Sequence, residues 1–447
     1  MNKKTLIIPK RIVTVDKDQQ ILKKVAVEIN ENKISSFIPV NKIDRSIYDG
    51  NIYDYPELTL IPGFVQTHVH LCQTLFRGLA DDLQLLDWLQ QKIFPFENAH
   101  DKNSLRISTR LGINELILGG TTTLLDMGTL RHQQVVFEEM INSGIRGFSG
   151  KCLIDRNELF PQFKSSTKAE IKNMQELADN FHNEESGRIK YGFAPRFVLS
   201  CSESLLKETK DMMNDFPGSV YHTHSSENED EIKTVRKEHN KENIEYFDSI
   251  NVLDDHTVLA HCIHVNDKEK QILKDQNVRV AHCPSANLKL GSGIAAIPDY
   301  LKRGISVSLG ADGAPCNNNL SAFTEMRLAA LIQKPLHGAE VMDAETVFNL
   351  GTIEGAKALH LEDEVGSIEI GKKADLVLID LNRNINSVSD DDEHVYSNIV
   401  YSSGADNVKS VMIDGKWVLE KGTSLIYDSN SLKSESEIEL KKLLSRL

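Results

Sequence analysis

Two histidines separated by a single residue, His68 and His70, have the residue type and spacing needed to bind a metal ion. They end the apolar run PGFVQTHVH, a pattern that is typical of a buried β-strand. In a strand, residues i and i+2 point to the same side, so both imidazoles can face one ion. Imidazole is a common ligand of zinc and iron. The pair alone is also compatible with two histidines on an exposed strand edge.

Polar residues follow three further apolar runs in the same manner: His224 in VYHTHSSE, His261 in VLAHC and Asp312 in VSLGADG. Because enzymes with an α/β barrel build their sites at the carboxyl ends of the strands, we expect these side chains to converge with His68 and His70. Three histidines and one aspartate can hold one divalent ion and leave room for water. His261 is either a further ligand or an unligated group that orients the attacking water.

Glu227 is the candidate proton carrier, because it lies just beyond the predicted strand that ends near His224. Water bound to a metal ion loses a proton readily, and a nearby glutamate can take that proton and pass it to a leaving group. We therefore predict that Glu227 is catalytic. The acids at positions 229–231 are expected to be exposed residues at the start of a helix. His222 and His282 are interpreted as structural.

Strands and helices must position these residues. From about residue 62 onward, apolar strand-like runs alternate regularly with amphipathic helical patterns. Eight strand candidates lie near residues 63, 122, 148, 190, 219, 257, 278 and 306. Their spacing favours a (β/α)8 TIM barrel over an open doubly wound sheet. We assign residues 61–362 to this barrel.

Both ends of the chain are rich in short strand patterns. Residues 1–60 contain β-branched runs separated by polar turns, which predicts small antiparallel strands. Short strands return over residues 363–425, as GSIEI, ADLVLIDL, VKSVMID and KWVLEKG, and Asp414-Gly415 is a hairpin signal. We therefore predict an α/β protein in which the two ends build one small β-sandwich domain beside the barrel. Residues 426–447 predict a helical tail.

Composition excludes several other classes of protein. The 447 residues are 40% hydrophobic and 26% charged, as in an ordinary globular protein. A net charge of −14 argues against a nucleic-acid or membrane partner and favours a small-molecule substrate. The six cysteines form no CxxC pair, which indicates a reducing compartment. The N-terminus lacks the apolar run of a signal peptide, and no stretch of 18 apolar residues occurs. We expect a cytoplasmic location.

Five motifs occur in an order that resembles one known family: PGFVQTHVH, HTHSSE, VLAHC, AHCPSANLKL and SLGADGAPCNNNL. Together they resemble the amidohydrolase superfamily, in its single-metal aminohydrolase branch. That branch includes deaminases of 5'-deoxyadenosine, methylthioadenosine, S-adenosylhomocysteine and guanine, as well as triazine hydrolases. The resemblance covers roughly residues 5–420.

The resemblance implies a role for each candidate residue. The implied metal ligands are His68, His70, His224 and Asp312. Glu227 would be the proton shuttle, His261 would polarise the attacking water, and Asp312 would also accept a proton from it. Relatives with two metals carry a lysine after the fourth strand, where this chain has Pro195 and Arg196. One divalent ion is therefore expected, with zinc as the first choice and iron as the alternative.

The stretch RGLADDLQLLDWLQQKIFPFE resembles the deaminases of adenosine derivatives. In those enzymes the residue equivalent to Glu97 binds the ribose hydroxyls, and a carboxylate is suited to accept both of them. Trp88 either covers the base or the 5' substituent, or packs in the core.

Other positions depart from that pattern. Arg196 and Gln73 resemble guanine deaminases and triazine hydrolases, and both side chains can read the edge of a heterocycle. Lys151 stands where S-adenosylhomocysteine enzymes use arginines to hold the amino-acid carboxylate, which favours 5'-deoxyadenosine or methylthioadenosine. For each of the three residues, a purely structural role is the alternative.

Hydrolytic deamination of an aminopurine nucleoside, such as 5'-deoxyadenosine, methylthioadenosine or S-adenosylhomocysteine, is the expected reaction. The alternative within enzymes is a deaminase or chlorohydrolase of a free heterocycle such as guanine, a pterin or an aminotriazine. A non-catalytic binding protein on the same scaffold is disfavoured, because all six expected site groups are present. A homo-oligomer, such as a dimer, would be in keeping with the family.

Overall fold

The computed structural model describes residues 4–383 and 391–447. All of the predicted barrel strands are present, and they lie side by side in chain order with parallel pairing. They are β6 (Phe64–His70), β7 (Thr121–Asp126), β8 (Arg146–Ser149), β10 (Ile189–Pro195), β11 (Val220–Ser225), β12 (Thr257–His261), β13 (Arg279–His282) and β14 (Ser306–Leu309). The short β9 (Cys152–Leu153) pairs with β10. The predicted barrel is confirmed.

The barrel closes where the chain beyond β14 returns to the first strand. A short strand, β15 (Asp312–Gly313), pairs in parallel with β6. Next to this pairing, Thr67 Oγ1 and Ser308 Oγ are 2.7 Å apart. Closure therefore brings the end of the last strand, with Asp312, against the end of the first, with its two histidines.

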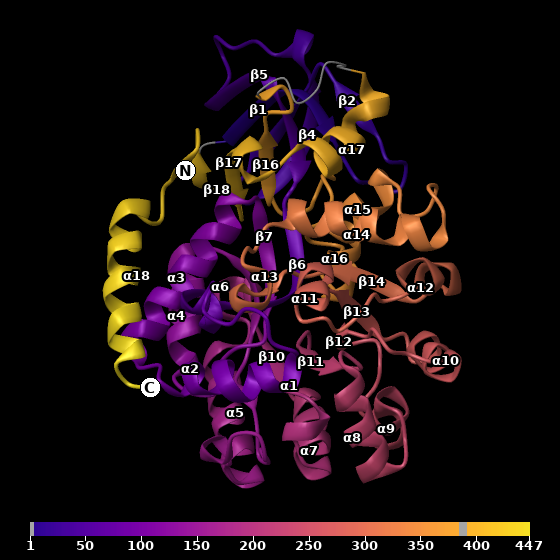
Figure 1. The fold of residues 1–447 in the computed structure, drawn as a ribbon. Coiled ribbons are helices and arrows are strands. Elements are labelled where there is room, and N and C mark those ends of the chain that lie inside the picture. The colour runs from indigo at the N-terminus through magenta and orange to yellow at the C-terminus, as the bar shows by residue number, and fades with distance from the viewer. Residues whose placement is uncertain (1–3, 384–390) are drawn as a thin grey trace.

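Helices surround the barrel (Figure 1). The main ones are α3 (Lys102–Leu118), α4 (Gln133–Ser143), α5 (Thr167–Phe181), α7 (Glu203–Met213), α8 (Glu229–His239), α10 (Asp267–Asp275), α12 (Ile297–Arg303) and α14 (Ala322–His337). Shorter ones are α6 (Glu184–Gly187), α9 (Asn243–Ser249), α11 (Pro284–Lys289), α13 (Ala314–Asn317), α15 (Ala344–Leu350) and α16 (Ile353–Ala358). Polar N-caps such as Ser166 and Ser202 satisfy the first backbone N–H groups of α5 and α7.

An irregular segment after β6 covers the carboxyl ends of the strands. It consists of the 3-10 turn η2 (Leu71–Phe76), helix α1 (Leu85–Trp88), a π-helical turn η3 (Leu89–Ile93) and helix α2 (Phe94–Asn98). Leu85, Trp88, Leu89 and Phe94 pack together in a buried apolar cluster. The segment therefore places an apolar cover over the end of the barrel where the candidate site residues lie.

The two chain ends pair in space beside the barrel, as predicted, and they form one hydrogen-bonded sheet, at the top of Figure 1. Its strands are β1 (Lys4–Val13), β2 (Ile21–Lys23), β3 (Val25–Asn30), β4 (Lys33–Pro39), β5 (Gly50–Pro62), β16 (Leu376–Ile379), β17 (Val408–Ile413), β18 (Lys416–Glu420) and β19 (Thr423–Ser424). The ends meet where β16 pairs with β5. The hairpin between β17 and β18 turns at Asp414 and Gly415, and both residues have positive φ.

Two details of the predicted sheet are wrong. Strands β1 and β5 pair in parallel, because the chain between them first forms the antiparallel pair β3 and β4. The run GSIEI at residues 366–370 is not a strand. Its Ile368 N–H donates to Thr14 O, but this bond does not continue into a ladder of paired residues. The domain limits stay predictions, although β5 ends at Pro62, close to the predicted boundary.

The predicted helical tail is confirmed as α18 (Ser429–Leu444), which lies along α3 (Figure 1). Leu432 and Leu443 of this helix pack against Phe76 and Phe96. Within the described ranges, no helix is both long enough and apolar enough to span a membrane. All six cysteines are buried and free. The cytoplasmic location stays a prediction.

Candidate active site

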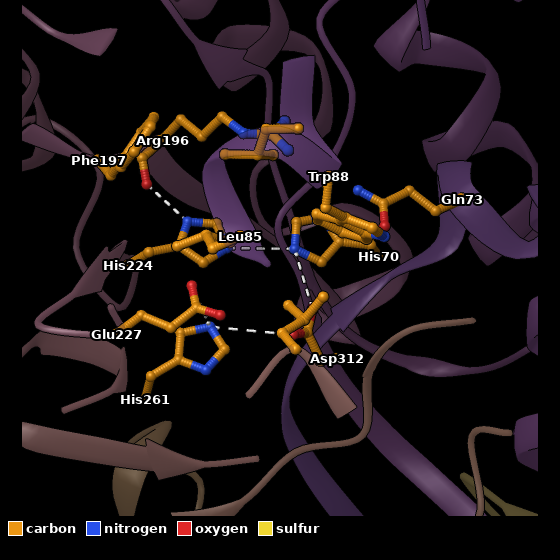
Figure 2. Close-up of a pocket in the computed structure, with 12 residues that line it drawn as sticks. His70, Gln73, Leu85, Trp88, Arg196, Phe197, His224, Glu227, His261 and Asp312 are labelled. Atoms are coloured by element: carbon orange, nitrogen blue, oxygen red, sulfur yellow. Dashed lines mark hydrogen bonds and ion pairs between the residues drawn. The ribbon is translucent and has the colours of Figure 1, made fainter. Parts of the chain in front are cut away.

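The four predicted metal ligands converge at the carboxyl ends of the strands (Figure 2). His68 and His70 come from β6, His224 from β11 and Asp312 from β15. His70 Nε2 lies 3.3 Å from His224 Nε2 and 3.4 Å from Asp312 Oδ1. His68 Nε2 lies 3.3 Å from the same Asp312 oxygen. Barrel closure has therefore brought four donor atoms from distant parts of the chain to one point.

Hydrogen bonds behind two of these histidines determine which ring nitrogen faces the cluster. His222 Nδ1 donates to Val258 O over 3.0 Å, so its Nε2 must accept, and it does so from His68 Nδ1 over 2.8 Å. This leaves the lone pair of His68 Nε2 directed at the cluster. His224 Nδ1 donates to Arg196 O over 2.6 Å, which leaves its Nε2 as the free acceptor. Both rings are held as neutral ligands for a cation.

The electrostatics of the cluster also suit a cation. Burial lowers the pKa of His70 and of His224 well below the ordinary value, so both rings are uncharged near neutral pH. His70 Nε2 and His224 Nε2 lie 3.3 Å apart, and a positive ion between them could bind a lone pair of each ring. Among the described residues, His68 Nε2 has no hydrogen-bond partner although it is buried. The chemistry of this donor set fits a divalent metal ion.

Glu227 and His261 lie together beside the cluster (Figure 2). Glu227 Oε2 is 3.5 Å from His261 Nε2, while His261 Nδ1 donates to Asn287 Oδ1 over 2.8 Å. Burial raises the pKa of Glu227 to about 7, and the carboxylate of Asp312 adds to this effect. Burial opposes a charge on His261, but Glu227 and Asp312 outweigh it and raise the pKa of the imidazole. Glu227 can therefore take up and release a proton near neutral pH.

Glu231 lies at the candidate site, although the sequence predicted an exposed acid. It is 1% exposed, and its Oε2 accepts from the backbone N–H of Glu227 over 2.9 Å. It belongs to a capping box with Asn228 at the start of α8. The spacing Asn-x-x-Glu is the sequence signal for such a box and would have identified it. Glu231 therefore fixes the backbone of the candidate proton carrier.

A cavity opens beside the cluster and has one apolar and one polar side. The apolar wall is formed by Leu85, Trp88, Leu89, Phe197 and Leu290. Gln73 and Arg196 form its polar wall. In Figure 2, both lie on the opposite side of His70 and His224 from Glu227 and His261. Such a cavity can hold a flat heterocycle between a polar wall and a proton-transfer pair.

Glu97 lies behind this polar wall. Its carboxylate accepts from Gln73 Nε2 over 2.8 Å and from the Arg196 guanidinium over 3.2 Å. The guanidinium also stacks 5.0 Å from the centre of the Phe94 ring. The structure therefore brings Glu97 to the site, but as the buried partner of two residues that line the cavity.

Lys151 is not brought to this cavity. Its ammonium group forms a buried ion pair with Glu170, and it lines a separate hollow together with His132 and Phe181. The hollow lies along helices α4 and α5. Lys151 was a candidate substrate contact because it follows a predicted strand, but its side chain points away from the cavity.

Comparisons with known proteins agree with this geometry. A model of the amidohydrolase family matches residues 59–418. The chain is 38% identical over 402 residues to a 5'-deoxyadenosine deaminase of Methanobrevibacter smithii, covering 90% of each chain. It is 35% identical over 408 residues to a 5-methylthioadenosine/S-adenosylhomocysteine deaminase of Desulfitobacterium hafniense, again covering 90% of each.

A solved structure also resembles the whole chain. An adenosine deaminase from Xanthomonas campestris with bound zinc superimposes with a TM-score of 0.91 at 28% identity, and the match covers 99% of this chain and 98% of that one. The family match spans most of the residues from β5 to β18, and the metal-ligand cluster lies within it. The protein belongs to the amidohydrolase family.

Proposed function

We propose that this protein is an aminohydrolase that releases ammonia from an aminopurine nucleoside such as 5'-deoxyadenosine, methylthioadenosine or S-adenosylhomocysteine. It is a hydrolase of carbon–nitrogen bonds in cyclic amidines. The main support for this function is the position of Glu227, which lines the cavity beside the four-donor cluster. Burial raises the pKa of this carboxyl group to about 7, a suitable value for proton transfer. The names of two relatives, each at least 35% identical, support the nucleoside class.

A single zinc ion is the proposed cofactor. Three donor separations in the cluster are 3.3, 3.3 and 3.4 Å. Such short separations between buried donor atoms support one divalent ion, which His68, His70, His224 and Asp312 would hold. An ion bound there would lower the pKa of a water molecule and so supply the nucleophile.

The chain's own residues would then handle the protons. Glu227 takes a proton from the attacking water and delivers it to the ring nitrogen next to the amino-bearing carbon. His261 orients the water through Nε2, since its Nδ1 is engaged by Asn287. Asp312, 3.9 Å from His261 Nε2, accepts the second proton of the water and returns it to the amino nitrogen, so that the carbon–nitrogen bond breaks and ammonia leaves. Trp88 and Phe197 cover the purine ring and keep bulk water away.

The charge balance of the cavity favours a substrate with an uncharged 5' group. Among the described residues that line the cavity, Arg196 is the one permanent cation, and Glu97 neutralises it. Lys151 is engaged by Glu170 outside the cavity. We therefore rank 5'-deoxyadenosine and methylthioadenosine above S-adenosylhomocysteine, which carries an amino-acid carboxylate.

A free heterocycle is the second candidate substrate. Gln73 and Arg196 present an amide and a guanidinium to the cavity, and such groups read a ring carbonyl or ring nitrogen. Turnover of guanine without turnover of any nucleoside would favour this alternative.

Ammonia release from purified protein tests the proposed function. The panel contains 5'-deoxyadenosine, methylthioadenosine, S-adenosylhomocysteine, adenosine, guanine and an aminotriazine, with metal content measured on the same samples. We expect turnover of the nucleosides at one equivalent of zinc per chain. Glu227→Gln should keep the metal and lose turnover by at least about a hundredfold, because no group then moves the proton. Full activity after metal removal would exclude the mechanism.

A further inference from the structure

A second group of potential metal ligands lies at the opposite end of the barrel from the candidate active site. Asp255 and His256 directly precede β12, and His360 follows α16. One ligand atom from each of these three side chains lies within 4.8 Å of the others. His261, at the other end of β12, is separated from His256 by about 16 Å of extended strand. The two groups therefore cannot share one ion.

Each of the two imidazoles keeps a ring nitrogen available for an ion. His360 Nε2 donates to Asp255 O over 2.8 Å, so in the neutral ring Nδ1 carries the free lone pair. Among the described residues, His256 Nδ1 has no hydrogen-bond partner although this atom is buried. A buried polar atom without a partner is costly, and a bound ion would remove that cost. The ring centroids are 4.0 Å apart, so both rings lie close enough to bind one ion.

The charges around the two rings suit a cation. Burial, together with the neighbouring His360, lowers the pKa of His256, so its ring is uncharged near neutral pH. The Asp255 carboxylate acts in the opposite direction on this pKa, because it places a negative charge near the ring. Imidazole nitrogens suit zinc, copper and nickel, whereas magnesium takes oxygen ligands. All three residues are partly exposed, so water can complete the coordination of an ion.

The backbone that carries His256 is fixed by several hydrogen bonds. Its N–H donates to Asp254 Oδ1 over 3.0 Å, and Lys210 Nζ donates to the same oxygen over 2.6 Å. His256 O accepts from the Tyr221 N–H of β11 over 3.0 Å. The loop before β12 is therefore held to the neighbouring strand and to α7.

The position of His360 is fixed by packing. Its neighbours Leu359 and Leu361 are buried in one apolar cluster with Val258 of β12. His360 itself has a φ of 54°, in the left-handed region, at the point where the chain leaves α16. The ligands on both sides are thus held in place before an ion binds, which lowers the entropic cost of binding.

We propose that Asp255, His256 and His360 form a second metal site, which takes one divalent transition-metal ion such as zinc. The ion joins the amino end of β12 to the segment that follows α16 and leads to the small sheet. Its role is structural, because none of its three ligands lines the cavity at the candidate active site. The inference does not depend on the proposed deaminase function.

Zinc content and thermal unfolding test this site in the full-length protein. At about 10 μM free zinc, equilibrium dialysis should give two equivalents per chain for the wild type. His360→Asn should bind one equivalent, because asparagine tolerates the left-handed backbone at this position but supplies no imidazole. The second zinc should raise the unfolding temperature of the wild type and leave that of His360→Asn unchanged. His256→Gln repeats the test if His360→Asn does not fold.

Three controls separate this site from the first ion and from casual binding. His337→Ala removes an exposed histidine on α14 and should keep two equivalents. His70→Ala removes a candidate ligand of the first ion and should keep one equivalent, at the second site. Combined with His360→Asn, it should bind none. Magnesium should not replace the second zinc, because two of the three ligands are imidazoles.

Two results would overturn the inference. One is a wild type that stays at one equivalent of zinc under these conditions. The other is a second equivalent that persists in both His360→Asn and His256→Gln, because the ion would then lie elsewhere. If the zinc-loaded protein releases ammonia from no nucleoside, the proposed function fails, but the count of the second equivalent still decides this site.

Discussion

Glu227 and His261 are a buried acid and base whose pKa values are both raised by their surroundings. Burial raises the pKa of Glu227 to about 7, while nearby carboxylates raise that of His261. Glu227 Oε2 and His261 Nε2 lie 3.5 Å apart, so the charge of each group acts on the other. A residue that must first accept and later deliver a proton works best in this range.

The pH dependence of activity follows from Glu227. It accepts a proton only when ionised, so kcat/KM should decline as the pH falls through its pKa. That pKa is about 7 without a cation, and a bound cation favours the carboxylate, so the midpoint should lie at or below this value. The profile of kcat/KM for 5'-deoxyadenosine between about pH 5 and pH 9 measures it. A flat profile down to the lowest pH would contradict this role of Glu227.

His222 should control metal affinity although it is not a ligand. It accepts from His68 Nδ1 and thereby selects the tautomer whose Nε2 faces the cluster. His222→Leu should weaken zinc binding about 10- to 100-fold, whereas His222→Gln keeps an acceptor and should lose much less. Competition with a chromophoric chelator measures both affinities. Equal zinc affinity in the two variants would show that the hydrogen bond does not matter.

At the scale of the elements, the ends of the strands are where the backbone leaves regular geometry. His261 and Asp312 have φ of 74° and 60°, and Ser226, next to Glu227, has φ of 54°. Such left-handed conformations are costly for these residue types and persist where surrounding contacts impose them. At Gly310, a Cβ atom would lie 2.6 Å from His68 O. This close approach lets the last strand pack against the ligand-bearing strand.

Helix α8 should affect the reaction rate through its first turn. Glu231 accepts from the backbone N–H of Glu227, so Glu231→Ala frees the loop that carries the proton carrier. A displacement of about 1 Å can cost up to about a hundredfold in rate, so we expect kcat to fall about 10- to 100-fold. Steady-state kinetics with metal analysis should show unchanged zinc content.

The exposed neighbour Glu229 provides the matched control in the same helical turn, and Glu229→Ala should leave kcat within about twofold. If Glu231→Ala had full kcat, the capping box would be structural only.

On the scale of the whole molecule, a buried ion pair joins the barrel to the small sheet. Arg146 at the start of β8 makes two hydrogen bonds to Asp375, at 2.8 and 3.0 Å, just before β16. Both side chains are at most 2% exposed. Asp375 also accepts from the backbone N–H of Asp414 in the β17–β18 hairpin. Arg146 also pairs with Asp414 directly, at 3.2 Å, so two carboxylates of the C-terminal half of the sheet bind one buried guanidinium of the barrel.

Asp375→Asn should therefore destabilise the protein without touching the site. Among the described residues, the substitution leaves the buried Arg146 with only the partly exposed Asp414 and Glu364 as partners, and we expect the free energy of unfolding to fall by up to about 3–5 kcal/mol. Urea unfolding of the zinc-loaded protein measures this change. The exposed pair of Lys172 and Glu176 serves as the control, since Glu176→Gln should change the free energy by less than about 1 kcal/mol. Equal effects of the two substitutions would contradict the joining role of Asp375.

Local patterns in the sequence were sufficient to predict the barrel strands, the hairpin at Asp414 and which strand ends carry the candidate metal ligands. Periodicity records which side of a strand faces the core, and a turn such as Asp-Gly needs only its own two residues. His68 and His70 share one side of a strand, so their pairing is a local property as well. Family motifs then related them to His224 and Asp312, which lie far along the chain.

The surroundings of individual side chains were decided only by the tertiary structure. Glu97 and Arg196 are 99 positions apart, and their ion pair exists because two segments close over the same barrel end. Lys151 turns to Glu170 in a separate hollow, and β1 pairs in parallel with β5, although local pattern indicated otherwise in both cases. Burial and the choice of partner depend on which distant segments meet in the fold. Periodicity could therefore predict the strands that carry the candidate ligands, whereas only packing decided which residues bond to those side chains.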